Sequence, residues 1–172
     1  LMSSYYNMLR CLTIVTRYSV LRKQFTDEKN KEVRIIDYQL QKYKIAKHLC
    51  KAYAMSLGLY RVMELIQQNE DCVKNNDFKY FQQIHLLLCE CKAFYTWWDY
   101  NCVVDSINAC GGHGYSAFAG FVTPFCENFA NQILEGENSL LCLQVARYLL
   151  TLAKKIASGD TSHCTGQFSY LI

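Results

Sequence analysis

Apolar residues recur every three or four positions over most of this chain, which is the spacing that places them on one face of a helix. The stripe of the first segment consists of Met8, Leu12, Val15, Ser19 and Arg22. The charged segment 26–32, TDEKNKE, has no periodic apolar positions. We therefore expect a helix near the N-terminus that is followed by a loop.

The next stretch predicts a second helix, which keeps one face for about seven turns. That face consists of Ile36, Gln39, Tyr43, Ala46, Cys50, Tyr53, Leu57 and Tyr60, with Gln39 as its polar exception. The polar segment 69–77 separates this helix from a third one. The face of the third helix consists of Ile84, Leu88, Cys91, Tyr95, Trp98 and Cys102.

A final helix is predicted over 138–156, and the tail 158–172 is expected to be irregular. The inward face of this helix consists of Leu141, Val145, Tyr148, Leu152 and Ile156. Each amphipathic stripe must be buried, and short connections make neighbouring helices run in opposite directions. The pattern therefore predicts an all-α fold, an antiparallel up-and-down four-helix bundle.

A length of 172 residues, with 51% hydrophobic and 19% charged residues, is typical of one folded domain with a substantial core. The net charge of +3 is spread along the chain, so no basic block indicates a nucleic-acid or membrane-surface partner. No run of about 18 apolar residues predicts a membrane span. Because residue 1 is Leu inside a predicted helix, we expect the chain to be a piece of a longer protein.

The sequence contains ten cysteines, which are scattered, with Cys89 and Cys91 as the only close pair. We favour reduced, mostly buried thiols of an intracellular protein, because free cysteine packs as a small hydrophobe. A disulfide scaffold is the alternative. His48 and His113 have no partners at the spacing of a metal site, so we predict no metal.

Four of the eight glycines fall within residues 109–120, ACGGHGYSAFAG. One glycine would suffice to cap the third helix in the left-handed conformation, whereas Gly111, Gly112 and Gly114 exceed that need. Glycine also lets the backbone approach a ligand, and exposed N–H groups can hold a phosphate. These residues alone leave both a plain turn and a ligand-contacting loop open.

Two further clusters carry candidate chemistry. In 134–140, LEGENSL, the carboxylates of Glu135 and Glu137 either mark the start of the last helix, with Asn138 as its cap, or provide a general base on a turn. In 17–25, RYSVLRKQF, three cations followed by the aromatic residue Phe25 are typical of a solvated helix end.

Taken together and in this order, the motifs RYSVLRKQF, IIDYQLQKYK, ACGGHGYSAFAG and LEGENSLLCLQVARYLL resemble the first C-terminal helical domain of the acyl-CoA oxidases. These are peroxisomal flavin enzymes related to the acyl-CoA dehydrogenases. The resemblance implies that residues 1–172 form this single domain. It also implies that an N-terminal α-domain, a β-domain and a second C-terminal α-domain are absent from the chain, so we expect the domain alone to be inactive.

The resemblance further implies roles for particular residues. Glu135 corresponds to the catalytic base of the family. The positions that would contact FAD are Arg22, Gln24, Phe25, Gln39, Gly111, Gly112, Glu137 and Asn138. The backbone at Gly111 and Gly112 would approach the cofactor across the interface of a homodimer.

The implied reaction is the α,β-dehydrogenation of a fatty acyl-CoA to a trans-2-enoyl-CoA, with O2 reduced to H2O2, in peroxisomal β-oxidation. Glu135 would take the α-proton while FAD accepts the β-hydride. Two alternatives stay open. One is an acyl-CoA dehydrogenase that passes its electrons to a carrier protein, and the other is a non-catalytic helical module for assembly.

Overall fold

Helices make up most of the chain in a computed structural model, which describes residues 1–78, 80–162, 164 and 166–172. The long elements are α1 (Met2–Leu21), α2 (Gln39–Lys74), α3 (Phe81–Ala109), α5 (Val122–Asn131) and α6 (Asn138–Ala157). The short elements are strands β1 (Lys23–Thr26) and β2 (Glu32–Arg34), helix α4 (Gly112–Tyr115), and the 3-10 turns η1 (Ile35–Asp37), η2 (Ala117–Ala119) and η3 (Gly166–Leu171).

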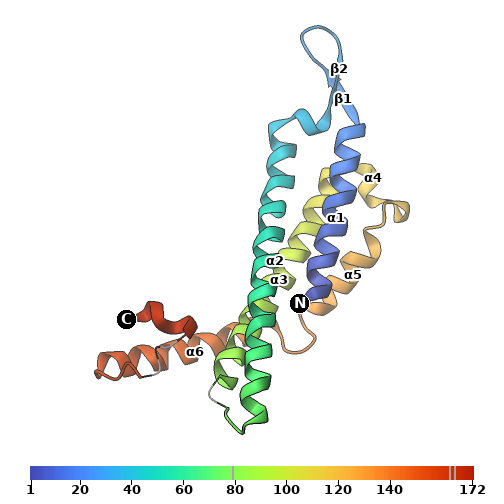
Figure 1. The fold of residues 1–172 in the computed structure, drawn as a ribbon. Coiled ribbons are helices and arrows are strands. Elements are labelled where there is room, and N and C mark those ends of the chain that lie inside the picture. The colour runs from blue at the N-terminus through green and yellow to red at the C-terminus, as the bar shows by residue number, and fades with distance from the viewer. Residues whose placement is uncertain (79, 163, 165) are drawn as a thin grey trace.

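The first three long helices lie side by side, with α2 running opposite to α1 and α3 (Figure 1). α3 packs against α1, α2, α5 and α6, so it is the central helix of the fold. α6 contacts α3 and projects to one side of this group, and η3 lies back along it (Figure 1). The all-α helical class is confirmed, with α6 joined to the bundle through α3.

Residues 23–34 form a small antiparallel hairpin in place of the expected loop. The two strands pair Lys23 with Arg34 and Thr26 with Glu32, and the register shifts between these two pairs. The carboxylate of Asp27 accepts hydrogen bonds from the backbone N–H groups of Lys29 and Lys31, both at 2.9 Å. An aspartate side chain that accepts hydrogen bonds from the backbone in this way favours a tight turn. The run of charged residues by itself does not indicate that turn.

The core lies between α1, α2 and α3. On α1 the predicted positions Met8, Leu12, Val15 and Ser19 are buried, as expected. Arg22 does not continue this stripe, because the helix ends at Leu21 and Arg22 adopts an extended conformation with its side chain exposed. The predicted face of α3 is confirmed, since all its members are buried or partly buried in this core or beside it.

The predicted face of α2 is wrong. Tyr53, Leu57 and Tyr60 are about 70% exposed, at 69%, 71% and 72%. The buried residues are His48, Ala52, Met55, Leu59 and Val62. This second stripe has the same spacing but is displaced by two positions, or about 200° around the helix. α2 therefore has apolar residues on two opposite sides, and periodicity alone could not decide which side is covered.

The inward face of α6 is confirmed in a smaller cluster. Leu152 packs with Leu86 of α3 and with Phe168 of η3, while Val145 and Tyr148 are partly buried against them. The ring of Tyr148 lies 5.3 Å from that of Phe168. Residues 166–171 of the tail, which we expected to be irregular, thus form a 3-10 turn that packs against α6.

The carboxyl group of Asp99 on α3 is completely buried. Neither of its oxygens has a hydrogen-bond partner among the described residues. Burial raises the pKa of Asp99 to about 8, although the nearby amide of Asn128 acts in the opposite direction. Asp99 therefore keeps its proton in the folded chain at pH values where the same residue in the unfolded chain, with the ordinary pKa of 3.8, has lost it.

Because the pKa is higher in the folded chain, its stability should fall as the pH rises from about 4 to about 8. We expect Asp99→Asn to raise the stability at pH 8 by about 1 kcal/mol or more and to change it much less at pH 4.5. Thermal unfolding followed by circular dichroism checks this, with the exposed Asp71→Asn as the control. Equal shifts for Asp99→Asn at the two pH values would contradict it.

Candidate functional site

A cavity of about 750 Å³ lies where the end of α1, the hairpin, the start of α2 and the end of α3 meet. Its lining consists of Tyr18, Arg22, Gln24, Phe25, Ile35, Tyr38, Leu40, Gln41, Asn108, Ala109, Cys110, Gly111, Gly112, His113 and Ser116. Five of the predicted cofactor residues are therefore brought together from separate parts of the sequence. They are Arg22, Gln24, Phe25, Gly111 and Gly112.

The hairpin fixes the polar side of this cavity. The Nη2 atom of Arg22 donates a hydrogen bond to Oε1 of Gln24 at 2.9 Å, and the hydroxyl of Tyr38 donates to the backbone oxygen of Gln24 at 2.8 Å. Phe25 has a φ of 63° and a side chain that is 73% exposed. The arrangement presents a guanidinium, an amide and an aromatic ring, which suit an anionic group attached to a planar ring system.

Gln41 lines the cavity, whereas the predicted residue Gln39 does not. The Nε2 atom of Gln41 donates to Oγ of Ser19 at 2.8 Å and to the backbone oxygen of Ala109 at 3.0 Å, so it ties α2 to α1 and α3. Gln39 is exposed at the first position of α2. Gln41 lies two turns before the buried His48 on the same side of α2, and not on the side that the periodicity predicted.

The three clustered glycines differ in whether the fold requires a glycine at their positions. Gly111 follows α3 with a φ of 57°, a left-handed conformation that favours glycine. A Cβ atom on Gly114 would overlap the carbonyl of Ile107. A Cβ on Gly112 would meet no atom within 4 Å, and its φ is not positive. The fold therefore requires Gly111 and Gly114, while the lack of a side chain at Gly112 has no explanation inside this chain.

The second predicted group lies at the turn between α5 and α6. Glu135 is exposed and has a φ of 59°, and the next residue, Gly136, has a φ of 108°. The carboxylate of Glu137 accepts hydrogen bonds from the backbone N–H groups of Ser139 at 3.0 Å and Leu140 at 3.2 Å. These bonds lower the pKa of Glu137. The sequence suggested Asn138 as the N-cap of α6. In the structure the N-cap is Glu137.

Asn138 is buried and has a structural role. Its Nδ2 atom donates to Oγ1 of Thr96 at 2.9 Å and to the backbone oxygen of Ala93 at 3.3 Å, while its Oδ1 accepts from Nζ of Lys92 at 2.8 Å. The residue is 0% exposed. The side chain has no accessible surface, and its polar atoms are all paired inside the domain. The cofactor contact implied for Asn138 stays a prediction.

The turn with Glu135 and the cavity lie at different levels of α3. The turn is attached to α3 through Lys92, and the cavity includes Ala109 at the end of the same helix. At 1.5 Å per residue, these positions are about 25 Å apart along the helix axis. Glu135 is not among the described residues that line the cavity. One chain therefore presents two separate groups of candidate residues.

The described part of the chain offers few other chemical features. It contains no group of three potential metal ligands, and each of the two candidate histidines has a different partner: His48 pairs with Asp105 at 2.7 Å and His113 with Tyr18 at 3.1 Å.

The ten cysteines are free thiols, and burial raises the pKa of Cys110 to about 11. Within residues 1–78, 80–162, 164 and 166–172, no helix has the length and apolar character of a membrane span.

Comparisons with known proteins agree on one family. Residues 1–150 match the family described as acyl-CoA oxidase, C-alpha1 domain. Mouse peroxisomal acyl-coenzyme A oxidase 1 is 32% identical over 167 residues, which are 96% of this chain and 25% of that protein. Acyl-coenzyme A oxidase 2, peroxisomal, from Arabidopsis thaliana is 34% identical over 159 residues, which are 92% of this chain and 22% of that protein.

Solved structures show the same likeness. Acyl-CoA oxidase-1 of Caenorhabditis elegans, complexed with FAD and ATP, superposes with a TM-score of 0.94 at 28% identity, over 98% of this chain and 26% of that one. Acyl-CoA oxidase-2 of the same organism, bound with FAD, ascaroside-CoA and ATP, gives a TM-score of 0.93 at 29% identity, over 99% and 26%.

The chain is thus a mostly helical domain, and it belongs to the acyl-CoA oxidase family. Within that family it corresponds to the C-alpha1 domain. It spans about a quarter of the length of the curated relatives that it matches.

The glycines provide a test of this site that needs no cofactor. We expect Gly114→Ala to destabilise the chain by about 2 kcal/mol or more, because its Cβ would overlap the carbonyl of Ile107. Gly112→Ala is the matched control and should leave stability unchanged within about 0.5 kcal/mol. Urea unfolding measures both variants. A loss of similar size for the two would show that Gly112 is also required by the fold.

Proposed function

We propose that this chain is the flavin-contacting domain of an acyl-CoA oxidase. The complete enzyme would convert a fatty acyl-CoA into a trans-2-enoyl-CoA and reduce O2 to H2O2. The observation that supports this most strongly is the meeting of Arg22, Gln24, Phe25, Gly111 and Gly112 at one cavity in a chain that belongs to this family. Two related C. elegans structures carry FAD.

The cavity suits the diphosphate and adenine portions of FAD. The guanidinium of Arg22 is exposed on its wall and can form charge-assisted hydrogen bonds with phosphate oxygens. Gly112 has open space where a side chain would be, so the backbone there can be approached closely. Phe25 offers an exposed ring for stacking. Gln39 and Glu137 stay predictions, and Glu137 would contact the cofactor while its carboxylate caps α6.

Glu135 would serve as the general base. Its carboxylate is exposed on the turn before α6, beside two residues with exposed apolar side chains, Ile133 at 56% and Leu134 at 59%. The base would take the proton from the carbon next to the thioester carbonyl, as the α,β double bond forms and the hydride leaves the β-carbon. The hydride acceptor would be a bound FAD, with O2 as the final electron acceptor.

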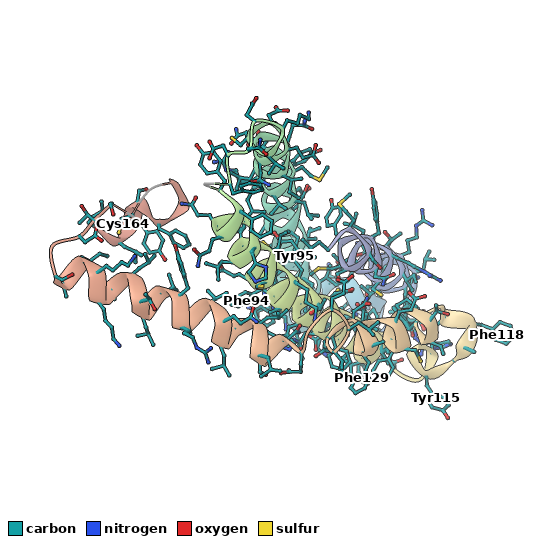
Figure 2. The ribbon with its side chains drawn as sticks, turned by 90° about the horizontal axis from the view of Figure 1, so that it is seen from below. Phe94, Tyr95, Tyr115, Phe118, Phe129 and Cys164 are labelled. Carbon is teal, nitrogen blue, oxygen red and sulfur yellow. The ribbon has the colours of Figure 1, made fainter. Side chains whose placement is uncertain are left out.

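The two separate groups of residues favour a homodimer in which each flavin is contacted by both chains. The Glu135 turn of one chain and the cavity of its partner would then belong to the same active site. Exposed apolar side chains beside the cavity support such contacts: Tyr115 is 92% exposed and Phe118 is fully exposed, and both point away from the domain in Figure 2. We infer a peroxisomal location from the relatives that match this chain.

The role of Glu135 can be tested in a chimera in which this chain replaces the matching domain of C. elegans acyl-CoA oxidase-1. We expect Glu135→Gln to lower H2O2 production from an acyl-CoA by about a hundredfold or more, because the amide cannot accept the α-proton. The flavin absorbance should be unchanged, and the exposed Glu70→Gln is the control.

Activity that survives in Glu135→Gln would show that another residue is the base. A chimera that binds no FAD would contradict the proposed flavin-contacting domain itself.

A further inference from the structure

A buried lysine lies next to the turn that carries Glu135. Lys92 of α3 is 9% exposed. Its Nζ atom donates to the backbone oxygens of Gln132 at 3.2 Å and Gly136 at 2.6 Å, and to Oδ1 of Asn138 at 2.8 Å. An ammonium group has three hydrogen atoms to donate, so all of them are used on this one segment.

The acceptors of Lys92 enclose residue 135. Gln132 and Gly136 precede and follow Glu135, and the backbone N–H of Asn138 closes the segment by donating to the oxygen of Gln132 at 3.2 Å. Glu135 has a left-handed φ of 59°, which residues other than glycine rarely adopt. This conformation persists only where surrounding contacts impose it, and the contacts with Lys92 do so.

A second set of contacts fixes the position of Lys92 itself. Asn138 holds Nζ through its Oδ1 and is bonded in turn to Thr96 of α3. The hydroxyl of Thr96 donates to the backbone oxygen of Lys92 at 2.9 Å, so the set closes on α3. Burial lowers the pKa of Lys92, while the charges of Glu135 and Glu137 raise it. The carboxylates of Glu135 and Glu137 thus favour the charged form of Lys92.

We propose that Lys92 is a positioning residue for the proposed proton transfer, because its ammonium holds the two carbonyls on either side of Glu135 and so fixes where the carboxylate points. This inference rests on the proposed function, in which Glu135 is the base. Lys92 itself touches neither substrate nor cofactor in this account. A lysine with only a structural role would stabilise the domain without affecting the proton-transfer step.

The test uses the same chimera with Lys92→Met, which keeps the length of the side chain and removes its charge. The control is Lys154→Met, which removes an exposed lysine from α6. We expect Lys92→Met to keep its FAD and to bind substrate with a KM within about twofold of the parent, while kcat falls about tenfold or more. The isotope effect on kcat with α-deuterated acyl-CoA should increase, because a misplaced base makes proton abstraction slower.

The possible results separate the two proposals. Wild-type kcat and isotope effect in a Lys92→Met variant that holds FAD would overturn the role of Lys92, while a large loss in Glu135→Gln would still support the base. Full activity in Glu135→Gln would instead contradict the proposed function, whatever Lys92→Met does.

If Lys92→Met loses its FAD or its helical circular dichroism signal, the Asn138→Ala variant tests the role of Lys92 instead. This variant keeps the lysine but removes one of the three acceptors of its ammonium group. A lower kcat with a larger isotope effect in that variant supports the proposal. Unchanged values in an Asn138→Ala variant that holds FAD overturn it.

Discussion

The burial of α3 is the constraint on which the rest of this domain depends. α1, α2, α5 and α6 all pack against it, and Lys92 near its middle and Ala109 at its end take part in or support the two candidate sites. Because a helix is rigid over this length, α3 sets a separation of about 25 Å between the turn held by Lys92 and the cavity that includes Ala109. The domain can therefore present both groups of residues at fixed positions, and a single chain does not bring them together.

The buried face of a helix could be predicted from the sequence for three of the long helices, and for α2 it could not. α1 has a single stripe, and α3 has so many apolar residues that its predicted face is buried together with others. α6 also carries exposed apolar residues at Leu140, Leu143 and Leu150, but its predicted stripe is the one that packs. On α2 the stripe with Tyr53 and Leu57 has the same period as the stripe with Met55 and Leu59, and only packing against α1 and α3 decides between them. The hairpin depended on the side-chain bonds of Asp27, which periodicity does not detect.

The grouping of residues at the candidate cavity could be predicted where a residue belongs to a family motif and remains at the surface. Arg22 and Gly111 meet these conditions, since they line one cavity although they are far apart in sequence. Asn138 belongs to such a motif, but its environment comes from Lys92 and Thr96 on another helix. The sequence does not indicate Lys92, because a lysine within a helix is usually solvated, and only the fold places its ammonium next to the turn of Glu135.

In the proposed function two chains complete each active site, because one chain holds its two groups of candidate residues about 25 Å apart. Mixed dimers measure this directly in the chimera, by combining one chain that carries Arg22→Ala with another that carries Glu135→Gln. If the cavity of one chain and the Glu135 turn of its partner serve the same flavin, each mixed dimer has one intact site and one doubly altered site. An equal, freely exchanged mixture should then regain about a quarter of the parental activity. Activity no higher than that of the two variants measured separately would contradict the shared site.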